Sequence, residues 1–287
     1  MAVGTTRGKR RLGRYVKPIR LRSKLSAEDV AERASCSAHT VYRLESGEAL
    51  PSRTRVAAIL AVIGATDEER QRAFELREVA DLGTKPIQHF EELPVKYRRF
   101  RLDETEAVIE RTLDMVIIPG LLQTEDYAHA ISVAARRLIK SDNWDEFAGP
   151  ERRERQALLT RDHSPLSYHG LIAEGALRNI IGGPSVLAGQ LDHLLKLIEL
   201  SQVTIQVIPF GFGACGITSG PLFLFGFADE DEQDAAYVES ALGMEAVQDS
   251  ADAAALAAVW DDVASAAPSP EQSAEMIRAE RKRVKKR

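Results

Sequence analysis

The 287-residue chain is 44% hydrophobic and 28% charged, an ordinary composition for a soluble globular protein that excludes a fibre or a disordered chain. Its length suits two domains. Its longest apolar runs, such as 222–227, are far shorter than the roughly 18 residues that a membrane-spanning helix needs, and no apolar stretch follows the first basic residues. We therefore expect a cytoplasmic protein with no membrane partner.

The charge is divided unevenly along the chain, whose net charge is -5. Residues 1–60 hold 13 Lys or Arg and 5 Asp or Glu, a balance of +8. The segment 278–287 adds seven bases and one acid, so residues 61–277 carry -19. A basic head on an acidic body suits contact with nucleic acid, because Lys and Arg displace the counterions that are condensed on phosphate.

Three helices are predicted after a basic arm over residues 1–11. Apolar periodicity predicts the first helix over 12–24, and a Ser-x-x-Asp capping box at Ser26 begins the second, over 27–34. A tight turn at 35–36 then leads to Ser37, which is expected to cap a third helix that continues through Leu44. Two short helices joined by about three residues have the spacing of a helix-turn-helix, in which the second helix enters the major groove of DNA.

The N-terminal domain is expected to continue to residue 82. Thr66 and Glu69 form a second capping box, which begins a helix that ends near Asp81. Glycine and two prolines then interrupt the periodicity, so the segment 83–94 is predicted to be a linker. The sequence therefore predicts an all-α helix-turn-helix bundle over 12–82.

The stretch 25–51, LSAEDVAERASCSAHTVYRLESGEALP, resembles the lambda-repressor/Cro-type helix-turn-helix of the xenobiotic-response-element family. The resemblance implies a double-stranded DNA operator as partner. It places the first residues of the recognition helix at base edges, with a flanking contact from Tyr42. Arg43 would then donate to guanine, Thr40 would meet a thymine methyl group, and His39 would contact a base or a phosphate. The residues placed at the DNA on this helix are Ala38, His39, Thr40, Tyr42 and Arg43.

The same resemblance places Arg53, in the loop after the motif, on a phosphate, and makes Glu45 a structural carboxylate that bonds backbone donors. The chain departs from the family pattern in having Ala27 where many relatives have Gln and Ser35 in place of the usual turn glycine. Basic residues of the arm and of the first helix, among them Arg11 and Arg14, either follow the DNA backbone or minor groove or are solvated. The alternative for the whole motif is a helical hairpin in a protein–protein module.

The second domain, over 95–266, is predicted to be an α/β domain with a small mixed sheet, which makes the chain α+β overall. Helices are expected over 103–110, from Thr124 to about 138, 150–160, 175–181, 184–200 and through 256–263, and strands over 167–173, 203–208, 222–227 and 235–239. A Pro-Ser spacer and a basic C-terminal helix or tail follow over 267–287. This tail either adds phosphate contacts or is solvated.

Four segments of this domain resemble the C-terminal domain of unknown function that is attached to helix-turn-helix proteins in actinobacteria. They are IPGLLQTEDYA at 118–128, RQALLTR at 155–161, EGALR at 174–178 with GGP at 182–184, and VIPF at 207–210. The resemblance implies an antitoxin-like transcription regulator related to the sporulation regulator WhiJ, with a small partner protein encoded nearby. A histidine often stands in that family where this chain has Cys215.

No catalytic constellation, cofactor motif or metal-ligand spacing is recognised in the second domain. The G-x-G-x-x-G pattern at 211–216 precedes another strand rather than a helix, which favours a hairpin loop over a dinucleotide site. Cys36 and Cys215 lack a C-x-x-C spacing, so both are expected to be free thiols. A ligand or partner pocket is predicted from Glu174, Arg178, Phe210 and Cys215. The alternatives are a surface ion pair between Glu174 and Arg178 and a buried, inert thiol at Cys215.

Three functions remain open on the sequence alone. The favoured one is a sequence-specific transcriptional regulator that acts as a homodimer, and whose DNA occupancy a small protein partner controls through the C-terminal domain. The second is a regulator that senses a small molecule. The third, which is disfavoured because no catalytic groups are recognised, is an enzyme with an accessory DNA-binding head.

Overall fold

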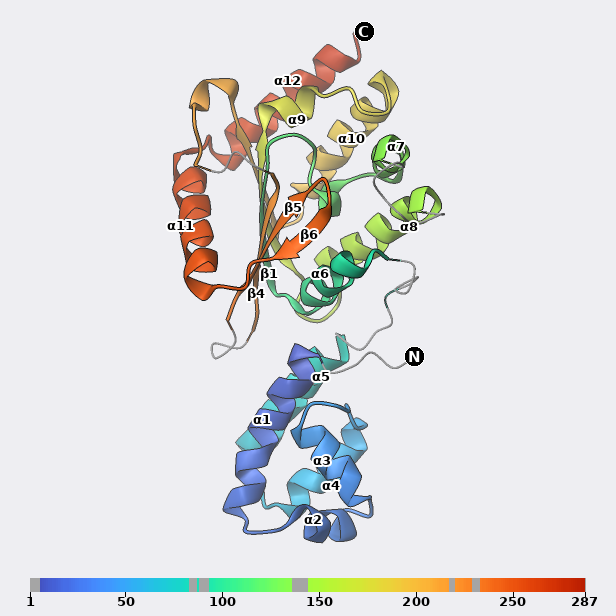
Figure 1. Ribbon diagram of the computed structural model, residues 1–287, viewed down its shortest axis with the longest axis vertical. Helices are drawn as coiled ribbons and strands as arrows, with labels where there is room; N and C mark the ends of the chain where they lie inside the picture. Colours follow the sequence, from blue (N-terminus) through green and yellow to red (C-terminus); the bar gives the residue numbers. More distant parts are fainter. Residues whose placement is uncertain are drawn as a thin grey trace. The chain divides into compact units, whose positions relative to one another are not determined.

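The computed structural model describes residues 6–82, 87, 93–135, 144–216, 220–228 and 233–286. The chain divides into two compact units, Met1–Ile87 and Gln88–Arg287 (Figure 1). Most of the predicted linker over 83–94 lies outside the described residues. The two units are therefore described separately.

The first unit is all-α, as predicted. Its described residues form α1 (Arg7–Arg22), α2 (Ala27–Arg33), α3 (Ala38–Glu45), α4 (Arg53–Val62) and α5 (Asp67–Leu82). Both predicted capping boxes are confirmed. Ser26 accepts from the backbone of Asp29, whose carboxylate accepts from the Ser26 backbone, and Thr66 and Glu69 make the same exchange. A single apolar core, which includes Leu12, Val30, Val41, Leu44 and Ile59, joins the helices.

Helix α1 begins earlier than the sequence predicted, which corrects the expected arm over residues 1–11. Residues 7–11 are helical, and Thr6 caps them by accepting from the Lys9 backbone. A Cβ atom at Gly8 would lie 2.7 Å from the Ala80 Cα, so this end of α1 packs directly against α5. Packing of this kind favours the helix over an extended arm. Residues 1–5 lie outside the described part of the chain.

The second unit is built on a mixed six-stranded sheet with the order β3-β2-β1-β4-β5-β6, which confirms the predicted α+β class. The β1–β2 and β2–β3 pairs are parallel, and the remaining pairs are antiparallel. The strands are β1 (Ile109–Asp114), β2 (Ser167–Ala173), β3 (Val203–Ile208), β4 (Leu222–Gly226), β5 (Ala235–Ser240) and β6 (Gly243–Ala246).

Helices cover both faces of this sheet (Figure 1). Helix α11 packs on one face, where its own Trp260 lies in one apolar cluster with Leu113 and Leu224, whereas the larger core on the other face includes Phe100 and Leu191. The helices are α6 (Val95–Glu106), α7 (Glu125–Ala135), α8 (Trp144–Gln156), α9 (Glu174–Arg178), α10 (Pro184–Leu197), α11 (Ser250–Ala266) and α12 (Pro270–Val284).

Two predicted helices differ from the structure, and two of its strands were not predicted. The helix expected over 103–110 is wrong, because α6 ends at Glu106 and Ile109–Asp114 forms strand β1 between β2 and β4. The helix expected to begin at Pro150 begins at Trp144, so Pro150 lies inside it, where a proline is normally unfavourable. Strand β6 was not predicted.

The basic C-terminal helix predicted within 267–287 is present, but it belongs to the second unit, which was expected to end at residue 266. Helix α12 begins with a Ser269 capping box and packs on α10 and β3. Ile277 and Val284 are buried in the larger core, and the Ser273 hydroxyl accepts from the Val207 backbone at 2.9 Å. The helix is therefore part of the α/β unit, and it covers the β3 edge of the sheet.

Candidate nucleic-acid interface

Helix α3, the predicted recognition helix, is buried on one face and exposed on the other. Val41 and Leu44 are fully buried against α1 and α2, and Ser37 caps the helix by accepting from the Thr40 backbone at 3.2 Å. The opposite face carries the side chains that were predicted to meet DNA. His39, Tyr42 and Arg43 are exposed, and Ala38 and Thr40 are half-buried.

The turn between α2 and α3 adopts a left-handed conformation without glycine. Ser35 has φ +52°, and the Cys36 backbone donates to the Ala31 carbonyl at 2.8 Å. Arg55, from α4, donates to the carbonyls of Ala34 and Ser35, both at 2.7 Å. These bonds hold the turn at Ser35, which stands in place of the glycine expected from the resemblance. Arg55 is a positioning residue that the sequence did not single out.

The C-terminal end of α3 is tied to α1 by a buried ion pair. Arg20 donates to both carboxylate oxygens of Glu45, at 2.6 and 2.9 Å, and to the Leu25 carbonyl at 2.9 Å. Glu45 is therefore structural, but its partner is a guanidinium rather than the backbone donors that were predicted. Gly13 lets the two helices approach, because a Cβ atom there would lie 2.5 Å from the Leu44 carbonyl oxygen.

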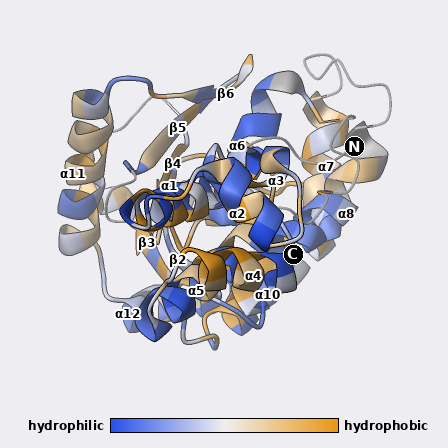
Figure 2. Cartoon of the chain, turned by 90° about the horizontal axis from the view of Figure 1, so that it is seen from below, coloured by the Kyte–Doolittle hydropathy of each residue, from blue (hydrophilic) through white to orange (hydrophobic). Residues whose placement is uncertain are grey.

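Arg53 occupies the first position of α4 and not the loop in which it was predicted to lie. Its guanidinium lies 2.6 Å from the Glu78 carboxylate and 4.5 Å from the centroid of the Phe74 ring. Arg11 and Arg14 lie on α1, where Arg14 is exposed and Arg11 is half-buried. Figure 2 shows hydrophilic residues along much of α1 and hydrophobic residues over most of α4.

The outward residues of α3 border a depression on the surface of the first unit. Its lining adds Lys17 of α1, which the sequence did not single out, to three of the predicted DNA contacts. The lining residues are Lys17, His39, Tyr42, Arg43, Glu45, Ser46 and Glu48. The Tyr42 hydroxyl donates to Glu28 at 2.9 Å, and Arg43 lies 3.8 Å from the exposed Glu48 carboxylate. Cationic and hydrogen-bonding groups thus stand together where a DNA groove would be read.

In the second unit, three of the four predicted pocket residues come together. Glu174 accepts from the Phe210 backbone at 2.9 Å and pairs with Arg178, whose guanidinium lies 5.2 Å from the centroid of the Phe210 ring. Cys215 instead packs in the core beneath α11, with its Sγ atom 3.8 Å from the Met115 Sδ. Within the described residues, neither Cys36 nor Cys215 takes part in a disulfide bond.

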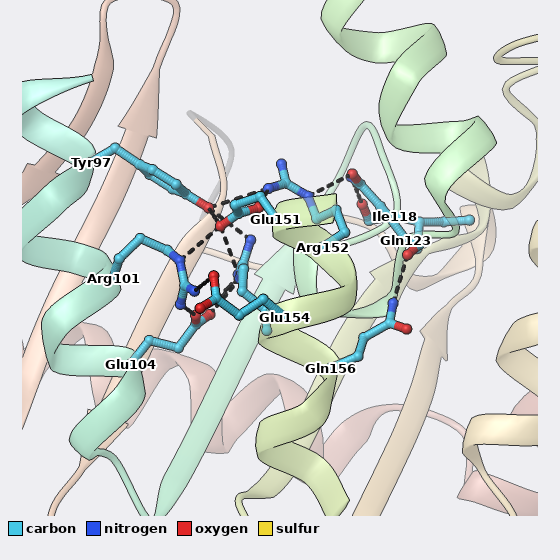
Figure 3. Close-up of polar contacts among 10 residues, drawn as sticks. Tyr97, Arg101, Glu104, Ile118, Gln123, Glu151, Arg152, Glu154 and Gln156 are labelled. Carbon is cyan, nitrogen blue, oxygen red and sulfur yellow. Dashed lines mark hydrogen bonds and ion pairs between the residues drawn. The ribbon is translucent and has the colours of Figure 1, made fainter. Parts of the chain in front are cut away.

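The sequence did not reveal a buried charge network between α6 and α8 (Figure 3). Arg155 donates to the Glu104 carboxylate at 2.6 and 2.9 Å, and Arg101 pairs with Glu104 and with Glu151. All four side chains are buried. Burial raises the pKa of Glu151, but the guanidiniums of Arg152, Arg155 and Arg101 outweigh this effect and lower it to about 2. The four groups neutralise one another inside the protein.

This network connects segments that are far apart in the sequence. Arg152 donates to the Gln123 side chain at 3.1 Å, and Gln123 donates to the Ile118 carbonyl at 2.7 Å. A Cβ atom at Gly120 would lie 2.6 Å from a nitrogen of Arg155, so only glycine fits there without displacing the guanidinium. Segment 118–128, which carries part of the family resemblance, thus contacts the C-terminal end of α8, where segment 155–161 begins.

No group of three or more His, Cys, Asp or Glu side chains that could hold a metal ion occurs among the described residues. Within those same residues, no helix is both long and apolar enough to cross a membrane.

Comparison with known families gives two matches. Residues 11–73 match a family described as a helix-turn-helix domain, and residues 97–279 match a family described as a domain of unknown function (DUF5753). No curated protein and no solved structure matches the chain. The second match spans more than half of the chain. The chain therefore belongs to the DUF5753 family and joins its domain of unknown function to the helix-turn-helix domain of a DNA-binding regulator.

Proposed function

We propose that the protein is a sequence-specific transcription regulator that reads a double-stranded DNA operator with α3. The observation that carries this proposal is the outward row of His39, Tyr42 and Arg43 on a helix whose other face is fixed in a core. An Arg side chain at this place can donate two hydrogen bonds to guanine, and histidine can donate or accept at a base edge. A recognition helix needs this combination of a rigid support and polar outward groups.

We further propose that the protein acts as a homodimer. A single short helix contacts too few base pairs for useful specificity, so regulators of this type bind two half-sites that are related by two-fold symmetry. The operator would then be a pseudo-palindrome whose half-sites lie about one helical turn apart.

For the second unit we propose binding rather than catalysis. The buried charges that join α6 to α8 neutralise one another, and large apolar side chains stand exposed where the parallel strands end. Such side chains favour a protein partner that covers them. The antitoxin-like, WhiJ-related family that the sequence resembles implies the same arrangement, in which a small partner protein controls DNA occupancy.

The test of DNA reading is selection from a random duplex library by the purified full-length protein, followed by fluorescence anisotropy at two salt concentrations. We expect an enriched pseudo-palindromic sequence with an affinity at least about 1,000-fold above that of a scrambled duplex. The double variant His39→Ala/Arg43→Ala should enrich no sequence, while keeping the helical content of the wild type. Sequence-specific reading would be refuted if the protein binds all duplexes with equal affinity and if these affinities fall in parallel as the salt concentration rises.

The test of partner control is binding by the product of a neighbouring small gene. We expect this product to bind the full-length protein and to change its affinity for the selected duplex. If it binds without any effect on DNA affinity, the control role is wrong.

A further inference from the structure

Three apolar side chains stand exposed together where the parallel strands of the sheet end. Val116 follows β1, Ile180 follows α9 and Phe210 follows β3, with exposed fractions of 60%, 38% and 66%. The Asn179 side chain donates to the Val116 carbonyl at 3.3 Å, which joins the first two segments. A Cβ atom built at Gly175 of α9 would lie 3.6 Å from the Phe210 ring, so the segment after β3 also lies beside α9.

The border of this group is basic. Figure 1 shows α9 beside α12, and Arg178 of α9 lies 3.6 Å from Glu280 of α12. Glu280 also pairs with Arg283, so its carboxylate is shared by the guanidiniums of Arg178 and Arg283. The Asp192 carboxylate is shared in the same way, by Arg281 and Lys285. Because cations outnumber the carboxylates that they contact, and because Lys282 and Lys286 are exposed as well, this end of α12 carries a positive surplus.

We infer that a surface formed by Val116, Arg178, Ile180 and Phe210, the strand-end surface, binds an acidic segment of a protein partner. This inference rests on the proposed control by a small protein and names the chemistry of that partner. Apolar side chains of the segment cover Val116 and Phe210, and its carboxylates meet Arg178 and the basic end of α12.

The composition of the surface favours a protein over a nucleic acid. Exposed Phe, Val and Ile side chains lose contact with water only when an apolar partner covers them, and nucleic acid offers mainly phosphate and sugar. Aromatic and Arg side chains are also the types that carry most of the energy in protein interfaces. Arg178 is held in place by Glu174 and by stacking on Phe210, so little of its conformational freedom is lost when it binds a carboxylate.

The probe is a phage-displayed library of random peptides, selected on the immobilised full-length protein. We expect enriched peptides that combine Asp or Glu with Leu, Ile, Phe or Trp. The substitutions Phe210→Ser and Lys282→Glu should each weaken binding of a synthetic enriched peptide at least about tenfold. Leu242→Ser is the matched control, because Leu242 is 81% exposed on the turn between β5 and β6. Thermal unfolding midpoints of all three variants should stay close to that of the wild type.

The inference is overturned if no acidic apolar peptide is enriched, or if the enriched peptides bind Phe210→Ser and Leu242→Ser equally well. It is also overturned if Lys282→Glu weakens binding of the selected duplex but leaves peptide binding unchanged, because the surface then serves nucleic acid. Successful selection of a DNA sequence alongside failed peptide selection would leave the DNA-reading proposal standing and remove this one. If no DNA sequence is enriched, but acidic peptides bind and Phe210→Ser weakens their binding, this inference stands and the DNA-reading proposal is removed.

Discussion

Arg20 donates to both carboxylate oxygens of Glu45, and this pair ties the end of the recognition helix to α1. Both side chains are almost buried, at 10% and 5% exposure. Loss of one partner leaves the other charge inside the protein without compensation, which costs about 3–5 kcal/mol. We expect Arg20→Met and Glu45→Leu each to lower the free energy of unfolding by roughly that amount, and the double variant to lose much less than the sum.

The measurement is urea denaturation followed by far-ultraviolet circular dichroism. Trp144 and Trp260 both lie in the second unit, so tryptophan fluorescence reports that unit separately and serves as the control. Additive losses in the double variant would show that the two residues act independently.

Glycine is needed at position 47 for two reasons that can be separated. Gly47 has φ +74°, and a Cβ atom there would lie 2.7 Å from the backbone of Arg10. Gly64 has φ +67°, but no described atom lies within 4 Å of its Cβ position. Gly64→Ala should therefore cost about 1 kcal/mol for the left-handed conformation alone. Gly47→Ala should cost at least about 1 kcal/mol more, because the α1 backbone must move. Equal losses in urea denaturation would mean that the contact with Arg10 relaxes freely.

Arg43 and Arg53 should affect DNA binding in different ways. Arg43→Ala is expected to cost about 1–3 kcal/mol on the selected duplex and to relax selectivity at one or two base pairs. Arg53→Ala should weaken every duplex alike and reduce the salt dependence by about one phosphate contact. Anisotropy titrations on the selected and scrambled duplexes at several salt concentrations measure both effects. If both variants lose the same affinity for the selected duplex and for the scrambled duplex, the assigned roles of Arg43 and Arg53 are wrong.

Asp114 should make the second unit less stable as the pH rises. Burial raises its pKa to about 6, although the backbone amides of Val116 and Ile117 donate to it and oppose this effect. A carboxyl group whose pKa is raised on folding stabilises the folded state below its unfolded pKa, and this stability is lost as the pH rises through 6. The free energy of unfolding of Asp114→Asn, relative to that of the wild type, should therefore rise by on the order of 3 kcal/mol between about pH 4 and pH 7. Urea denaturation followed by tryptophan fluorescence measures this difference, and a difference independent of pH would contradict the prediction.

Local patterns predicted most of the elements, because their causes lie within a few residues. The capping boxes at Ser26 and Thr66 depend on partners three residues away. Strands β2 and β3 were predicted with their observed bounds, because both are short apolar runs between breaks. The residues of α3 were assigned for the same reason, since an N-cap and a stripe of two apolar side chains define its faces.

The incorrect or missing predictions concern elements and contacts that depend on residues far apart in the sequence. Strand β1 contains Glu110, Arg111 and Asp114, which look like solvent-facing helix residues when read alone. Glu110 is fully buried, and burial with the nearby Glu104 raises its pKa. The pair of Glu104 and Arg155 joins residues 51 positions apart, which no single sequence pattern reports. The core position of α12 did have a signal, since Ala274, Ile277 and Val284 recur at helical spacing beneath the basic residues.

Placing α12 against the β3 edge also sets the order in which the molecule can be completed during synthesis. The described apolar core of the first unit lies within residues 12–76, so it can form once α5 has left the ribosome. The second unit lacks Ile277 and Val284 until α12 emerges, and until then β3 has a free edge that can pair with another chain. A nascent chain would therefore carry a finished DNA-reading head before it can shield its own sheet.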